Sequence, residues 1–175
     1  AGWSAVELLP PSDETRNGVL LNMASAFRRL GLRDAAMSCY HIVEQWAAWP
    51  EHRVEAQVES AVVAAESAEA PTFDTRRGEL LETVDRSDRS LTGLVDLGLG
   101  RGSLLLDRVD DAREHLRAAI AAARDTGSED LLGRAEELLR ALEDRAEPEM
   151  EAATPSDASR RIAEQVASLG LAPVS

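Results

Sequence analysis

The chain has 175 residues, 44% of them hydrophobic, which is enough for one domain with a buried core and excludes wholesale disorder. Its formal net charge of −13 disfavours nucleic acid and anionic membranes as partners, because both are bound by clustered basic side chains. A single cysteine, Cys39, leaves no internal disulfide and no CxxC metal or redox site. With no apolar run of transmembrane length and no signal-peptide pattern, we expect a cytoplasmic location.

Alanine, leucine, glutamate and arginine dominate the chain, which favours helix over strand. All 19 basic residues are arginine, a composition typical of high-GC bacterial genomes. From residue 14 the apolar positions follow a helical period up to Gly31, and a second helix is predicted over 34–48, ending before Pro50. Two helices joined by so short a turn form an antiparallel hairpin.

The middle of the chain is predicted to be irregular. A helix is expected over 51–69, then the stretch APTFD at 70–74 is expected to break the chain, before a short helix over 75–86. Further helices are predicted over 89–106, 111–124 and 128–145.

Two of these hairpins share a motif. The first reads Leu20-x2-Met23-Ala24-x2-Phe27 and then Ala36-x3-Tyr40, and the later one reads Asp96-x2-Leu99-Gly100-x2-Ser103 and then Ala112-x3-Leu116. In both, the small residue precedes the alanine by 12 positions (24 to 36 and 100 to 112). The pattern resembles the tetratricopeptide repeat (TPR), whose 34-residue unit reads W-x2-L-G-x2-Y and then A-x3-F. The two alanines are 76 residues apart, so two such units leave about eight extra residues, which we assign to the stretch at 70–74.

The resemblance implies an all-α fold: a short right-handed superhelix of antiparallel helix pairs over 1–145, with about three repeats and a capping helix. An acidic linker at 146–155 and a C-terminal helix at 156–169 complete the chain. Two roles for this last helix stay open, because it either folds back into the concave groove and occludes it or packs as a terminal cap.

The fragment GLVDLGLGRGS, residues 93–103, also has the letters of the glycine-rich loop of S-adenosylmethionine-dependent methyltransferases. Such a loop needs a buried strand before it and a second strand after its helix. The chain after Gly102 is helical in pattern, and only 73 residues remain. The helix of a repeat is therefore the favoured interpretation. Gly100 occupies the small position of the motif, whereas Gly98 and Gly102 have no evident reason to be glycine.

No catalytic constellation is evident. Cys39 and His41 are two residues apart on a helix and point in different directions, and His52 and His115 lack the spacing of a metal site. Trp46 and Trp49 are expected to pack in the core or between repeats, with an interface role as the alternative. We therefore expect no enzyme activity, no cofactor and no metal.

The predicted function is a noncatalytic scaffold that binds a protein or peptide, as the sensory or assembly domain of a bacterial regulator. An export or assembly chaperone, with a possible homodimer, is the alternative, and a methyltransferase is the remote one. The first helix of each TPR unit usually lines the groove. The candidate groove residues are Arg16, Asn17, Asn22, Arg28, Asp96, Arg101 and Ser103.

Overall fold

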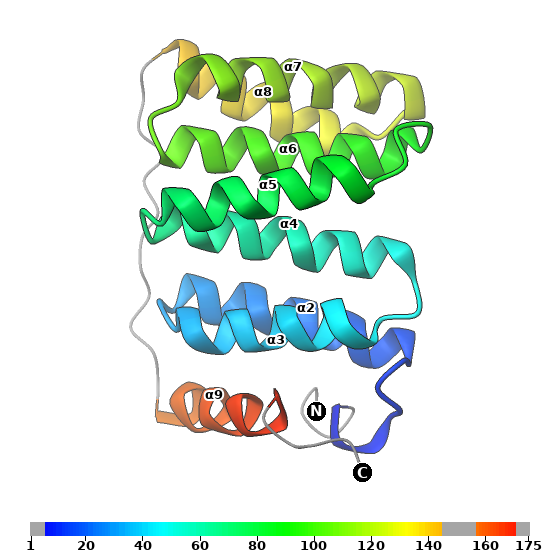
Figure 1. Cartoon of the computed structure of the whole chain (residues 1–175), viewed down its shortest axis with the longest axis vertical. Coiled ribbons are helices and arrows are strands. Elements are labelled where there is room, and N and C mark those ends of the chain that lie inside the picture. Colours follow the sequence, from blue (N-terminus) through cyan, green and yellow to red (C-terminus); the bar gives the residue numbers. More distant parts are fainter. Residues whose placement is uncertain (1–5, 145–156, 171–175) are drawn as a thin grey trace. The chain divides into compact units, whose positions relative to one another are not determined.

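The structure, a computed structural model, describes residues 6–144 and 157–170, and all the regular elements in these ranges are helices (Figure 1). The all-α prediction is thereby confirmed. The helices are α2 (Glu14–Arg29), α3 (Arg33–Trp46), α4 (Pro50–Glu66), α5 (Ala70–Thr83), α6 (Arg89–Leu105), α7 (Val109–Thr126), α8 (Glu129–Glu143) and α9 (Asp157–Gly170). The chain forms two compact units, one of Ala1–Ala56 with Met150–Ser175 and one of Gln57–Glu149, and the division falls inside α4.

Local side-chain chemistry fixes several of the helix starts. The Asp13 carboxylate accepts a hydrogen bond from the Arg16 amide at 3.2 Å, the Asp88 carboxylate accepts from two amides, and the Ser128 hydroxyl accepts from the Leu131 amide at 3.4 Å. Each satisfies amides that have no partner inside the helix. The acidic linker predicted at 146–155 lies outside the described residues.

The prediction for residues 70–74 was wrong. Helix α5 begins at Ala70 and includes the whole APTFD stretch. Pro71 lies in the first turn of the helix, where its missing N–H has no acceptor to lose and its fixed φ is already helical. The proline therefore starts the helix instead of interrupting the chain.

The turns after α2, α4 and α6 have the same backbone geometry. Gly31, Ala68 and Asp107 have φ values of 72°, 58° and 57°, and in each case the next helix begins two residues later. The intervening residue donates its amide to the carbonyl five residues before it, from Leu32 to Phe27, Glu69 to Ala64 and Arg108 to Ser103, each at 2.9 Å. Such a bond around a left-handed residue is the usual way to close a helix C-terminus.

These turns also align buried positions in all three helix pairs, whereas the sequence motif aligned only the first and the third pair. Seven residues before each left-handed residue lie Ala24, Ala61 and Gly100, and five residues after it lie Ala36, Phe73 and Ala112, all of them buried. The middle pair therefore has the same 12-residue spacing, and the predicted eight-residue insertion does not exist there. The turns instead recur at intervals of 37 and 39 residues, from 31 to 68 to 107.

Candidate functional site

Helix α6 contains the whole glycine-rich fragment, so Gly98, Gly100 and Gly102 are helical and do not form a loop. A Cβ atom added at Gly98 would collide with the Val58 side chain of α4, and one at Gly102 would collide with the ring of Phe73 of α5. A Cβ atom at Gly100 would lie 2.8 Å from Cγ of Leu116 in α7. The glycines thus let three different helices approach α6 closely, which explains the two positions for which the sequence offered no reason.

Gly102 compensates for an unusual residue in the middle helix pair. Phe73 stands where the other two pairs have Ala36 and Ala112, and its ring is fully buried. Its ring edge occupies the space that a side chain at position 102 would need. A large residue on α5 is therefore matched by an absent side chain on α6, which keeps the interior close-packed.

A buried polar pair joins α6 to α7. The Asp96 carboxylate lies 2.9 Å from Nδ1 of His115, and the two residues are only 7% and 8% exposed. Asp96 stands at a large apolar position of the TPR pattern, so the pairing shows how this chain accommodates a carboxylate there. The histidine is paired inside the hairpin and does not present its ring to solvent.

The seven candidate groove residues have different surroundings. Four of them are buried: Arg16, Asn17, Asp96 and Ser103. Nε of Arg16 donates to the Val6 carbonyl at 3.0 Å, and Arg101 forms a 2.7 Å ion pair with Glu59 of α4. Asn22 is exposed and Arg28 is partly exposed on α2. That these residues line a partner groove stays a prediction, and the exposed amide of Asn22 is the most accessible of them.

The sequence candidates for nucleophilic or metal chemistry are not assembled into a site. Cys39 is fully buried, and burial raises the pKa of its thiol to about 12, so the thiolate is suppressed at neutral pH. His41 is exposed. Among the described residues, no three histidine, cysteine or acidic side chains are grouped as metal ligands. In the part of the chain that the structure describes, no helix combines the length and apolarity needed to cross a bilayer.

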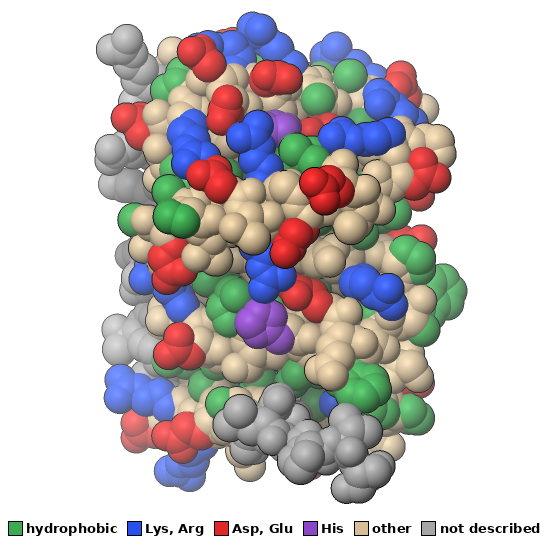
Figure 2. Space-filling view, in the orientation of Figure 1, with side chains coloured by type: hydrophobic (Ala, Val, Ile, Leu, Met, Phe, Trp, Pro, Cys, Tyr) green, Lys and Arg blue, Asp and Glu red, His purple; other side chains and the backbone are tan. Residues whose placement is uncertain are grey.

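Surface charge is mixed where it is visible. In the face shown in Figure 2, acidic and basic side chains alternate, without a broad patch of either sign. Ion pairs also join neighbouring helices: Arg108 pairs with Asp74, and its hydrogen bonds lower the pKa of that carboxyl group.

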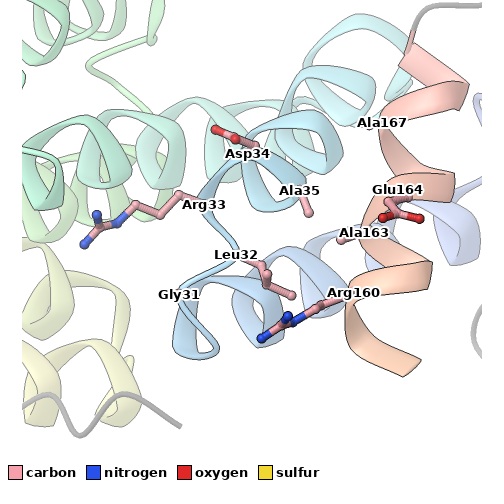
Figure 3. A pocket seen from close by; sticks show the side chains of 9 residues that line it. All are labelled: Gly31, Leu32, Arg33, Asp34, Ala35, Arg160, Ala163, Glu164 and Ala167. Carbon is pink, nitrogen blue, oxygen red and sulfur yellow. The ribbon is translucent and has the colours of Figure 1, made fainter. Parts of the chain in front are cut away.

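A cavity of about 560 Å³ lies in the first unit, between the α2–α3 turn, the start of α3, and α9 (Figure 3). Leu32, Ala35, Ala163 and Ala167 supply its apolar lining. Its charged lining has one basic and one acidic residue from each side, Arg33 and Asp34 from α3 and Arg160 and Glu164 from α9. The cavity is largely open to solvent, so it is a surface depression and not an enclosed ligand pocket.

Sequence reasoning did not find this cavity. The helix end at Gly31 and the C-terminal helix were both predicted, but they are about 130 residues apart along the chain. No local pattern links them. Comparisons of the chain with family models, with curated proteins and with solved structures found no match.

Proposed function

We propose that this chain is a TPR-like helical repeat scaffold without catalytic activity, which binds a protein or peptide partner. One observation carries the proposal: three successive helix pairs share the same left-handed turn, and two buried positions 12 residues apart recur around each turn. Repeated helix pairs of this kind commonly stack into surfaces that bind extended or helical segments.

Among the described helices, α2 is the best candidate for a helix that lines the groove. Its apolar face is buried through Leu20, Ala24 and Phe27, while Asn22 remains exposed. An exposed amide both donates and accepts hydrogen bonds, as recognition of a peptide backbone requires. Neutral polar groups of this kind also suit a partner of either charge.

The proposal is tested by selecting peptides from a displayed library on the full chain and measuring their affinity by fluorescence anisotropy. Asn22→Arg places a long cation on the expected groove helix and should weaken binding about tenfold or more. Gln45→Arg is the matched control, because Gln45 is an exposed amide on the second helix of the same pair, and its affinity should change less than about twofold.

Two results would contradict the scaffold. One is equal loss of affinity in both variants, which would place binding away from the first helix. The other is saturable heat in calorimetry with S-adenosylmethionine, since the helical α6 has no loop to hold that cofactor. We expect no heat in that titration.

A further inference from the structure

The last described helix, α9, packs on α3 within the first unit. Val166 is fully buried there, and Ile162 and Ala163 are half-buried, whereas Arg160, Arg161 and Glu164 are exposed. One narrow face of a 14-residue helix is thus covered. An isolated helix of this length is marginal in water, so α9 depends on the surface of α3 for its stability.

The fit between α9 and the rest of the unit is incomplete. The cavity of about 560 Å³ lies between the α2–α3 turn and α9 and is largely open to solvent, and α9 lines it with Arg160, Glu164 and the methyl groups of Ala163 and Ala167 (Figure 3). Leu32 on the opposite side of this cavity is only partly buried, so some of its apolar surface stays uncovered. A helix with a larger aliphatic side chain at position 163 or 167 would bury more of that surface.

We propose that the surface of α3 beneath α9 is a binding site for an amphipathic helix of a partner protein, and that α9 is its built-in competitor. The partner carries a larger aliphatic side chain at the position that Ala163 occupies in α9. This inference rests on the proposed scaffold function and assigns the partner class and the regulation of one of its surfaces.

Because the charges that line the cavity cancel, the choice between partner helices depends on their apolar side chains. On the α3 side Arg33 and Asp34 cancel, and on the α9 side Arg160 and Glu164 cancel. The site is therefore locally neutral although the chain as a whole carries −13. Discrimination between helices then depends on how well their side chains fill the cavity, and each added methylene contributes about 0.8 kcal/mol of transfer free energy.

The attachment of α9 to the same chain sets the strength of the competition. A covalently linked segment acts at an effective concentration on the order of millimolar. A free peptide with the α9 sequence should therefore bind the intact chain weakly. Removing the docking of α9 should expose the site, and filling the cavity should raise the affinity of the competitor.

The experiment uses fluorescein-labelled synthetic peptides with the sequence of residues 157–170, natural and with Ala163→Leu, titrated into the full chain. Val166→Asp removes the buried anchor of α9 and leaves α3 intact, and should raise the affinity for both peptides about tenfold or more. Arg161→Asp is the matched control, since it adds the same carboxylate to an exposed position of α9. The Ala163→Leu peptide should bind each chain about tenfold more tightly than the natural one.

A second measurement needs no variant of the chain and covers the case in which Val166→Asp unfolds the first unit. Titration of the unaltered chain with the Ala163→Leu peptide should shift the NMR amide signals of Leu32 and Ala35 saturably, and those of α7 should stay fixed. Shifts confined to other helices would overturn the inference.

Four further outcomes would also overturn it. Equal affinities of the Val166→Asp and unaltered chains would show that α9 does not compete. Equal affinities of the two peptides would show that the cavity does not select. A dimer of the unaltered chain that Val166→Asp dissociates would identify a second copy as the occupant. If no chain binds either peptide while library-selected peptides still depend on Asn22, this inference fails and the scaffold function stands.

Discussion

At the scale of single residues, the decisive feature is the set of glycines on α6. A glycine inside a helix costs about 1 kcal/mol relative to alanine, so three within five positions require compensation. The compensation is tertiary: Val58, Leu116 and Phe73 each occupy the space of a missing side chain. Close approach of neighbouring helices accounts for the glycine-rich sequence.

Gly98→Ala should therefore destabilise the protein although alanine favours helix. The new methyl group meets Val58, whose β-branched side chain is buried and stiff, and overpacking of this kind costs about 1–3 kcal/mol. Gly133→Ala is the control, because nothing lies within 4 Å of a Cβ atom there, and it should stabilise by about 0.5–1 kcal/mol. Urea unfolding measures both, and a stabilising Gly98→Ala would contradict the packing account.

The Asp96–His115 pair makes a second prediction at this scale. Asp96→Ala leaves a buried imidazole without its partner and should cost about 1–3 kcal/mol of unfolding free energy. Asp110→Ala, which removes the highly exposed partner of Arg113, should change stability by less than about 1 kcal/mol. In a double-mutant cycle with His115→Ala, a coupling energy near zero would show that the pair does not interact.

At the scale of elements, the turns after α2, α4 and α6 form a natural comparison series. The same left-handed position is filled by glycine, alanine and aspartate in turn. A left-handed conformation costs a residue with a Cβ atom about 1–2 kcal/mol, so the turns are equal in geometry and unequal in strain. The repeated hydrogen-bond pattern, and not residue identity, defines the unit.

Reciprocal substitutions should consequently have opposite effects. Gly31→Ala should destabilise by about 1 kcal/mol, purely through backbone strain, because a Cβ atom there meets nothing within 4 Å. Ala68→Gly, at the equivalent turn, should stabilise by up to about 1 kcal/mol. Thermal unfolding of the two variants and the parent chain checks both signs, and two shifts in the same direction would refute the equivalence of the turns.

At the scale of the whole molecule, the chain divides into two compact units. The first unit combines α2 and α3 with α9, while α5 to α8 belong to the second. The core of the second unit is a cluster around Leu97, Leu116 and Leu131. Separate cores allow separate local stabilities.

Hydrogen exchange should resolve these units. Val166→Asp should accelerate amide exchange in α3 and leave α7 at the rate of the parent chain, because the buried contact of α9 lies in the first unit. Gly98→Ala should accelerate amide exchange in α7 and leave α3 at the rate of the parent chain. Mass spectrometry of peptic fragments provides the measurement, and equal acceleration of α3 and α7 in both variants would indicate a single cooperative unit.

Much of the secondary structure could be predicted from local pattern. Helical periodicity placed α3, α6 and α7 close to their observed bounds, and Gly31 marked a real helix end because its effect is local. The stretch around Pro71 was predicted wrongly because proline has opposite meanings at the first turn and in the interior of a helix. The 12-residue spacing from Ala61 to Phe73 was visible but was missed, since phenylalanine stands where alanine was expected.

The sequence by itself determined that this protein is helical, where most of its helices lie, and which faces they bury, because propensity and periodicity are properties of neighbouring residues. The tertiary structure alone decided why Gly98 and Gly102 are glycine, that Asp96 meets His115, and that α9 packs on α3 beside an open surface cavity. Each of these facts depends on atoms from helices distant in the chain. Only close packing in three dimensions specifies which of those atoms meet.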